Sequence, residues 1–173
     1  AAVRRRCVSD LEACALAHAY HHAPLLFAAL AADATPRVNE FKVHEPSNTA
    51  WALAKAEHKA LPLFDALAAE ATPRLSEFAT QQLSNTAWAF AKAEHKAPIL
   101  FDALAAEATP RLNEFKEQEL SNTAWAFAKA EHKALTLFDA LAAEATPRLS
   151  EFETQQLSNT AWACAKAEHK APT

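Results

Sequence analysis

Apolar residues in the segment 80–115 recur at helical spacing and predict two helices. The first spans residues 81–94 and has one apolar face, formed by Leu83, Ala87, Phe90 and Ala91. Thr80 directly precedes this helix and is expected to be its N-cap. The pattern therefore predicts an amphipathic helix, called helix A, whose apolar face is buried.

The other faces of helix A carry polar and aromatic side chains. A polar face lies nearly opposite the apolar one and consists of Gln81, Asn85, Lys92 and Lys96, with only Ala89 among them. A flank between the two faces consists of Ser84, Trp88 and His95. Because a helix in a stack has neighbours on both sides, we expect this flank to contact the next repeat.

A second helix, called helix B, follows the turn His95-Lys96-Ala97. Pro98 suits its first position. Apolar residues then keep helical spacing over 16 residues: Leu100, Phe101, Leu104, Ala105, Ala108, Leu112 and Phe115. Pro110 interrupts this pattern, and because proline lacks an N–H and clashes with the preceding turn, a kink or break is expected there. Glu107 and Arg111 are four residues apart and are expected to pair across it.

The two helices recur with a period of 37 residues. The sequence Ser-Asn-Thr-Ala-Trp occurs four times and ends at Trp51, Trp88, Trp125 and Trp162. Segment 121–157 is identical to 84–120 at 31 of 37 positions and to 47–83 at 34 of 37. A period of this length is typical of a solenoid, in which each unit packs only on its neighbours. The predicted fold is all-α, a right-handed α-solenoid of stacked helical hairpins.

The predicted domain organisation is one repeat array over residues 1–173. It comprises a degenerate first repeat (10–46), three full repeats (47–83, 84–120 and 121–157) and a truncated fifth (158–173). The chain contains no Met and stops one helix into a repeat, so we expect it to be an excerpt of a longer protein.

Composition narrows the function classes. Glycine is absent, which excludes a P-loop or a G-x-S-x-G elbow in this segment, and no catalytic constellation is found. The chain is therefore predicted to be no enzyme and to need no cofactor or small-molecule substrate. No apolar run reaches 18 residues, which predicts no membrane span. Cys7, Cys14 and Cys164 are too irregular for a disulfide framework.

The distribution of charge is more informative than the net charge of −4, which argues against nucleic acid. Each helix A and its turn carry two lysines, whereas helix B and its connector carry most of the acid. The lysines and a parallel row of asparagines are the candidate RNA-binding residues: Asn48, Lys55, Lys59, Asn85, Lys92, Lys96, Asn122, Lys129, Lys133, Asn159, Lys166 and Lys170. Lysine neutralises phosphate and an amide can contact a base edge, so this ladder suits single-stranded RNA.

Two other readings of the array stay open. Lysines at helix ends also favour the helix dipole, and a protein–protein scaffold would use the same groove. A structural spacer inside a larger protein is the third possibility.

The segment Leu83-Ser84-Asn85-Thr86-Ala87-Trp88-Ala89-Phe90-Ala91-Lys92, with Leu100-Phe101 and Leu112-Asn113-Glu114-Phe115, resembles the octotricopeptide-type repeat. The related heptatricopeptide repeat has a 37-residue unit, which is the period here. The resemblance implies an RNA-binding α-solenoid that acts in chloroplast or mitochondrial transcript stability, processing or translation. Members often have glycine in the turn, where this chain has Glu94-His95-Lys96, so the turn geometry stays open.

Three further groups have competing interpretations. The tryptophans could stack on bases, but packing between repeats is favoured. His58, His95, His132 and His169 form a regular column that lacks a converging ligand set, so we interpret them as turn residues tolerant of unusual backbone angles. Cys14, His18, His21 and His22 would permit a zinc site, but drift of a degenerate repeat explains them more simply.

Overall fold

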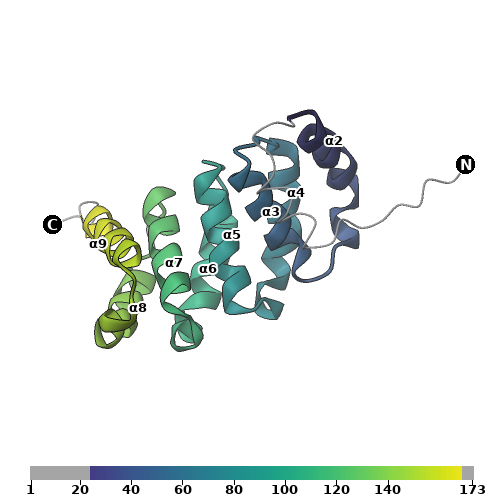
Figure 1. The fold of residues 1–173 in the computed structure, drawn as a ribbon. Helices are drawn as coiled ribbons and strands as arrows, with labels where there is room; N and C mark the ends of the chain where they lie inside the picture. The colour runs from purple at the N-terminus through teal and green to yellow at the C-terminus, as the bar shows by residue number, and fades with distance from the viewer. Residues whose placement is uncertain (1–23, 169–173) are drawn as a thin grey trace, which may run out of the picture.

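The computed structural model describes residues 24–168, which form a stack of α-helical hairpins (Figure 1). Eight α-helices lie in this range, and it contains no strand. They are α2 (Pro24–Ala34), α3 (Glu45–Lys55), α4 (Leu61–Ala71), α5 (Thr80–Lys92), α6 (Pro98–Ala108), α7 (Glu117–Lys129), α8 (Leu135–Ala145) and α9 (Thr154–Glu168). The odd-numbered helices from α3 onward are helix A, and the even-numbered ones are helix B. The all-α prediction of stacked hairpins is confirmed.

Each helix B ends two residues before its internal proline, and the chain continues as a 3-10 helix. These 3-10 segments are η1 (Thr35–Glu40), η2 (Thr72–Glu77), η3 (Thr109–Glu114) and η4 (Thr146–Glu151). At the junction of α6 and η3, Thr109 Oγ1 donates a hydrogen bond to the Ala105 carbonyl at 2.7 Å. Arg111 pairs with Glu107 at 2.9 Å across the junction. The break at Pro110 and this ion pair were both expected from the sequence.

The start of helix A differs from the prediction by one residue. Thr80 is the first residue of α5, and the N-cap is Ala79. The Gln82 side chain stabilises this end, because its Oε1 accepts a hydrogen bond from the Ala79 N–H at 2.8 Å. The prediction of a Thr80 N-cap was therefore wrong.

The core is continuous from repeat to repeat, because aromatic rings cross each boundary. Phe64 in α4 meets Phe90 in α5 edge to face, with ring centroids 5.1 Å apart. Phe101 in α6 meets Phe127 in α7 in the same way, also at 5.1 Å. Each helix B thus packs on helix A of the following repeat, as expected of units that cannot bury their apolar faces alone.

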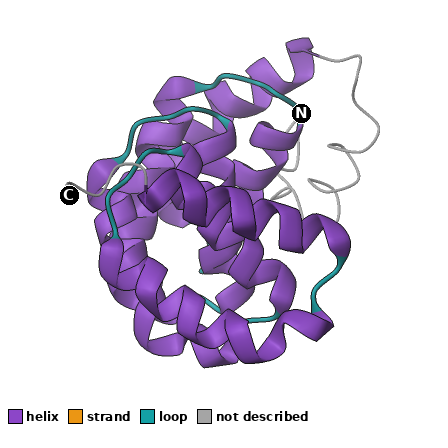
Figure 2. Ribbon diagram, turned by 90° about the vertical axis from the view of Figure 1, so that its left-hand side faces the viewer, coloured by secondary structure: helices purple, strands orange, loops and turns teal. Residues whose placement is uncertain are grey.

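The two rows of helices are packed differently. Successive A helices lie side by side in close contact, whereas each 3-10 segment packs against helix B of the following repeat and separates the B helices. The row of A helices is therefore the tighter row, and the stack curves around it (Figure 1). Viewed from the C-terminal end, the loops gather at the edges of the stack (Figure 2). We call the edge with the A–B turns the turn edge and the other the connector edge.

Small side chains permit the close approach of the A helices. Ser84 in α5 donates a hydrogen bond to the backbone carbonyl of Glu119 in α7 at 3.2 Å. Ser47 and Ser121 make the equivalent bonds to Gln82 and Gln156, both at 3.1 Å. The expected contact of the Ser84 flank with the next repeat is confirmed.

Candidate nucleic-acid interface

The exposed part of helix A is a narrow stripe that differs from the polar face expected from the sequence. Ala89, expected among polar residues, is fully buried. Beyond its first turn, where Thr80 and Gln82 are also partly exposed, the accessible side chains of α5 follow Gln81 along the helix: Asn85, Trp88 and Lys92. This row, which we call the inner stripe, recurs in α7 and α9, and α3 carries its asparagine, tryptophan and lysine. The stripe therefore includes the tryptophans, which sequence reasoning assigned to packing.

The asparagines of the inner stripe have free amide groups. Asn48, Asn85, Asn122 and Asn159 are all partly buried. Within residues 24–168 their side chains make no hydrogen bond. A primary amide offers two donors and an acceptor, so each repeat presents an unused polar group beside its tryptophan.

The tryptophans contribute both to packing and to the surface. Trp51, Trp88 and Trp125 pack against the core but stay partly exposed, and Trp162 is 43% exposed. The rings of Trp88 and Trp125 lie 6.3 Å apart between centroids and are inclined by 31°. The spacing i, i+3, i+7 of asparagine, tryptophan and lysine is the signal that sequence reasoning left unused, because it places all three on one face.

Three of the four lysines of the inner stripe bind carboxylates of the preceding repeat. Lys92 Nζ lies 3.2 Å from Glu57, Lys129 Nζ 2.8 Å from Glu94, and Lys166 Nζ 3.5 Å from Glu131. These pairs are exposed, so each contributes little to stability, and salt screens them. They are weak enough for a phosphate to compete with the carboxylate.

The carboxylates come from an unusual position in the A–B turn. Glu57, Glu94 and Glu131 have φ angles of 53°, 55° and 57°. In the second of these turns, the His95 N–H donates to the Phe90 carbonyl at 3.0 Å, and the Glu94 N–H donates to the Ala91 carbonyl at 3.2 Å. This pattern is a Schellman motif, whose left-handed position usually carries glycine. Glutamate fills it here, which settles the turn geometry.

For His58, His95 and His132 the interpretation that they adopt unusual backbone angles was wrong, because the glutamates before them do. His169 lies outside the described residues, and His95 and His132 connect consecutive repeats. His95 Nε2 lies 2.9 Å from Asp65 Oδ1, and its ring stacks on Phe64 with centroids 5.5 Å apart. His132 makes the same contact with Asp102, also at 2.9 Å. Residues 24–168 contain no group of three potential metal ligands. The Cys14, His18, His21 and His22 cluster lies outside the described residues.

The turn lysines are the more available cations. Lys59, Lys96 and Lys133 are exposed. Within residues 24–168, Lys59 and Lys96 have no ion pair, in contrast to the lysines of the inner stripe. Lys170 lies outside the described residues.

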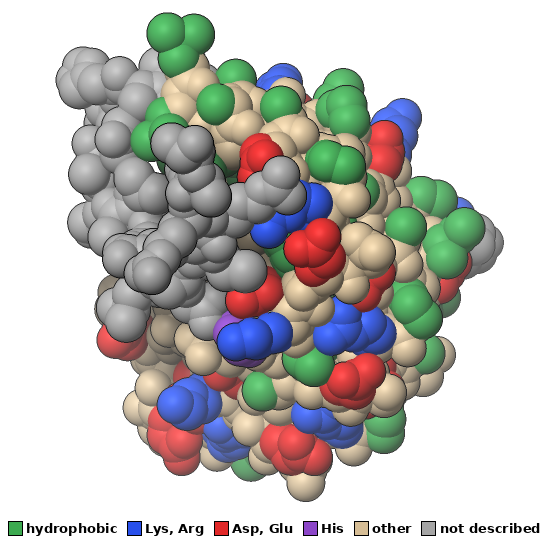
Figure 3. Space-filling model, turned by 90° about the vertical axis from the view of Figure 1, so that its right-hand side faces the viewer, with side chains coloured by type: hydrophobic (Ala, Val, Ile, Leu, Met, Phe, Trp, Pro, Cys, Tyr) green, Lys and Arg blue, Asp and Glu red, His purple; other side chains and the backbone are tan. Residues whose placement is uncertain are grey.

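The sequence placed most of the acid on helix B and its connector. In the structure, acidic residues are not confined to the helix B row. The connector edge carries much of the acid, and its arginines are paired: Arg74 with Glu70 at 2.6 Å, and Arg148 with Glu117. The turn edge also holds Asp65 and Asp102, next to histidines and lysines. On the face shown in Figure 3, basic and acidic side chains lie next to one another. The contrast in charge therefore runs between the two edges.

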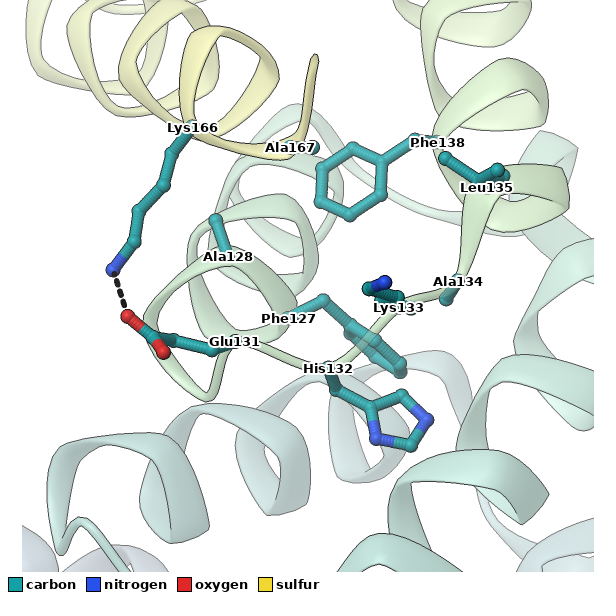
Figure 4. A pocket seen from close by; sticks show the side chains of 10 residues that line it. All are labelled: Phe127, Ala128, Glu131, His132, Lys133, Ala134, Leu135, Phe138, Lys166 and Ala167. Carbon is teal, nitrogen blue, oxygen red and sulfur yellow. Dashed lines mark ion pairs between the residues drawn. The ribbon is translucent and has the colours of Figure 1, made fainter. Parts of the chain in front are cut away.

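Hollows form on the turn edge where consecutive repeats meet. One of about 430 Å³ is lined by Phe90, Glu94, Lys96, Phe101, Lys129 and His132, among others. The next along the chain is narrower, about 50 Å³, and Figure 4 shows the Lys166–Glu131 pair at one side and Phe127 and Phe138 on the other walls. Apolar surface makes up most of the lining of both hollows, which also includes lysines and carboxylates.

Comparison with known families identifies the relationship. Residues 59–172 match the family described as RNA-editing substrate-binding complex 6 protein. The chain belongs to this family. Comparison with curated proteins found no match.

Membership in the RNA-editing substrate-binding complex 6 family supports the expected repeat fold, an RNA-related role and one of the expected organelles. The chain is a helical repeat protein with an RNA-related role, connected with an RNA-editing complex. The family is mitochondrial, and the mitochondrion is one of the two organelles that the octotricopeptide resemblance implied. Within residues 24–168, no helix is long and apolar enough to cross a membrane.

The ion pair between Glu94 and Lys129 predicts a stability difference that depends on pH. The pKa of Glu94 is lowered from its ordinary value of 4.5, mainly because Lys129 donates a hydrogen bond to it. A carboxyl whose pKa is lowered by folding stabilises the fold when the pH is above its ordinary pKa. This stabilisation is lost as the pH falls through the pKa of the folded state. The variant Glu94→Gln should therefore melt at a lower temperature than the wild type at neutral pH, and the difference should disappear in acid, once the pH has fallen below 4.5 and through the lowered pKa of Glu94. Thermal denaturation at both pH values measures this.

The control is Glu153→Gln, an exposed carboxylate with no ion pair among the described residues. It should leave the melting temperature nearly unchanged at both pH values. A Glu94→Gln difference that persists undiminished in acid would show that the charge is not the cause.

Proposed function

We propose that this chain is a non-catalytic RNA-binding array, which binds single-stranded RNA along the inner stripe and the turn edge. The repeats 47–83, 84–120 and 121–157 would each contribute one set of contacts, and 158–173 a partial set. The contact residues are Asn48, Lys55, Lys59, Asn85, Lys92, Lys96, Asn122, Lys129, Lys133, Asn159, Lys166 and Lys170, joined by the four tryptophans. The proposed setting is RNA editing in mitochondria, in line with the family.

The observation that carries this proposal is the repeated row of asparagine, tryptophan and lysine on adjoining helices. An amide without a hydrogen-bond partner can contact a base edge, and an aromatic face stacks on a base whatever its identity. Lysines then neutralise phosphates along the same line. The octotricopeptide resemblance supports the same arrangement, since helix A carries its characteristic residues.

The two sets of lysines have different roles in this proposal. Lys59 and Lys96 form no ion pair within residues 24–168, although Lys59 lies near enough to Glu94 to lower its pKa, so both can meet phosphates at a smaller cost. Lys92 and Lys129 must first exchange a carboxylate for a phosphate, or share their ammonium between both. We therefore expect the turn lysines to dominate the electrostatic part of RNA affinity.

A filter-binding series at increasing salt with mixed-sequence single-stranded RNA tests the proposal. The double variant Lys59→Gln and Lys96→Gln should make the slope of log affinity against log salt shallower by about 1.4, because each phosphate contact on a single strand contributes about 0.7. The matched control replaces the exposed Lys42 and Lys116 by glutamine, which removes the same charge from the connector edge.

Two results would contradict the proposal. One is an absence of binding to any single-stranded RNA at low salt. The other is an equal change of slope in the control, which would mean that net charge alone governs binding.

A protein–protein scaffold is the second candidate, and one specific feature favours it. Leu61, Ile99 and Leu135 occupy the start of successive B helices and are 53%, 75% and 56% exposed. Leu61 and Leu135 are equivalent positions of the repeat, and Ile99 lies one position later in the repeat between them. A group of exposed aliphatic side chains is typical of docking surfaces. Replacing all three by serine should leave the salt slope of RNA binding unchanged, because these side chains carry no charge, whereas docking of a protein on them should be lost.

A further inference from the structure

The spacing of Trp88 and Trp125, the one pair of tryptophans in ring contact among residues 24–168, is close to that of alternate stacking with nucleobases. The ring centroids of Trp88 and Trp125 lie 6.3 Å apart. Stacked layers in nucleic acid repeat every ~3.4 Å, so a base between two rings requires about 6.8 Å, close to the observed separation. The planes are inclined by 31°, so a small rotation of the side chains makes them parallel. This spacing therefore accommodates one base between Trp88 and Trp125.

Trp51 and Trp162 each have a ring face that is accessible to a cation. Lys55 Nζ lies over the ring of Trp51, 5.8 Å from its centroid, and Lys166 Nζ lies 5.1 Å from that of Trp162. A ring face that an ammonium group approaches is not covered by the core. Aromatic platforms of this kind hold single strands through stacking and nearby cations.

The asparagines next to the tryptophans add an amide group that can recognise a base through hydrogen bonds. Asn85 precedes Trp88 by three residues, so the two side chains lie side by side on the helix surface. The same relation holds for Asn122 and Trp125. An asparagine amide can pair with adenine through N6 and N7, one acceptor with one donor. Because the amides are free among the described residues, a base can bind them without displacing an internal hydrogen bond.

We propose that the inner stripe binds adenine-rich single-stranded RNA with one nucleotide per repeat, each base lying between the tryptophans of consecutive repeats. This rests on the RNA-binding function proposed above. The asparagine and the tryptophan recur unchanged, so every repeat takes the same base. Adenine combines the amide pairing with the larger stacking surface of a purine.

Binding of oligo(A), oligo(U) and oligo(C) of equal length, at one salt concentration, tests this register. Oligo(A) should bind at least about tenfold more tightly than the others. It should also quench tryptophan fluorescence in step with binding. The double variant Asn85→Ala and Asn122→Ala should weaken oligo(A) binding about tenfold and leave the salt slope unchanged. The matched control replaces Asn39 and Asn113, which are exposed on the 3-10 segments, by alanine and should change neither.

The outcomes separate this inference from the proposed function. Equal affinity for the three homopolymers would overturn the adenine register while RNA binding stands. Tryptophan fluorescence that stays constant at saturation would overturn the stacking, and it needs no variant. If no homopolymer binds at low salt, the RNA-binding function itself fails.

Discussion

Replacing Phe101 by alanine is expected to lower the free energy of unfolding by about 4 kcal/mol, the largest stability effect that we predict. Phe101 is 2% exposed and packs on Phe127 and His132 of the following repeat. The substitution therefore removes the core of one hairpin and its connection to the next at once. Neighbouring helices cannot close the cavity without losing their own contacts, so the cost should be near the upper part of the usual range.

Urea denaturation followed by circular dichroism measures this loss. The matched control is Ile99→Ala, two residues earlier on the same helix, where the side chain is 75% exposed. The control should change stability by less than about 0.5 kcal/mol. Because repeats couple only to their neighbours, the Phe101→Ala transition should also broaden as the two halves of the array unfold separately. A loss below about 1 kcal/mol would mean that the repeat boundary does not depend on this ring.

The sequence was sufficient for the fold because each feature of it is local and repeated. The apolar face of helix A with Phe90, the start of helix B at Pro98 and the break before Pro110 all follow from spacing within one repeat. Stacking follows from the period. These predictions needed no knowledge of how far one repeat is rotated against the next.

The orientation of the surface could not be predicted in the same way, because it depends on contacts between repeats. Ala89 looked polar-facing on a wheel, but the adjoining helix A buries it. The 3-10 segment that contains Pro110, η3, separates the B helices and brings the A helices together. That packing turns the accessible stripe toward Trp88, so a residue assigned to packing becomes part of the candidate site.

The charge pattern also depends on contacts 35 residues apart. Lys129 and Glu94 belong to different repeats, and their pairing appears only after the turns are superposed in the stack. Glu94 reaches the lysine because its backbone adopts a left-handed angle, φ 55°, that propensity assigns to glycine. The set of residues that forms the site therefore stays a prediction. The structure shows which of its lysines form ion pairs within residues 24–168.

The close packing of the A helices predicts the second large effect. Ala126 in α7 is fully buried, at the position that corresponds to Ala89 in α5. Replacing Ala126 by leucine adds three carbon atoms where no space is available, so we expect destabilisation of about 3 kcal/mol, the upper end for overpacking. Because the inner stripe lies on the same helices, forcing them apart should also change the separation of Trp88 and Trp125.

Chemical denaturation of Ala126→Leu and of a matched control measures the destabilisation. The control is Ala106→Leu, the same change at an exposed position of α6, which should alter stability by less than about 0.5 kcal/mol. Tight packing of the A helices predicts a large difference between the two variants, whereas loosely joined repeats would accommodate both equally. RNA affinity of the folded Ala126→Leu variant connects this packing to function. If the spacing of the tryptophans sets the register, the affinity for oligo(A) should fall. The salt slope should stay nearly unchanged, since the lysines lie at the ends of the helices.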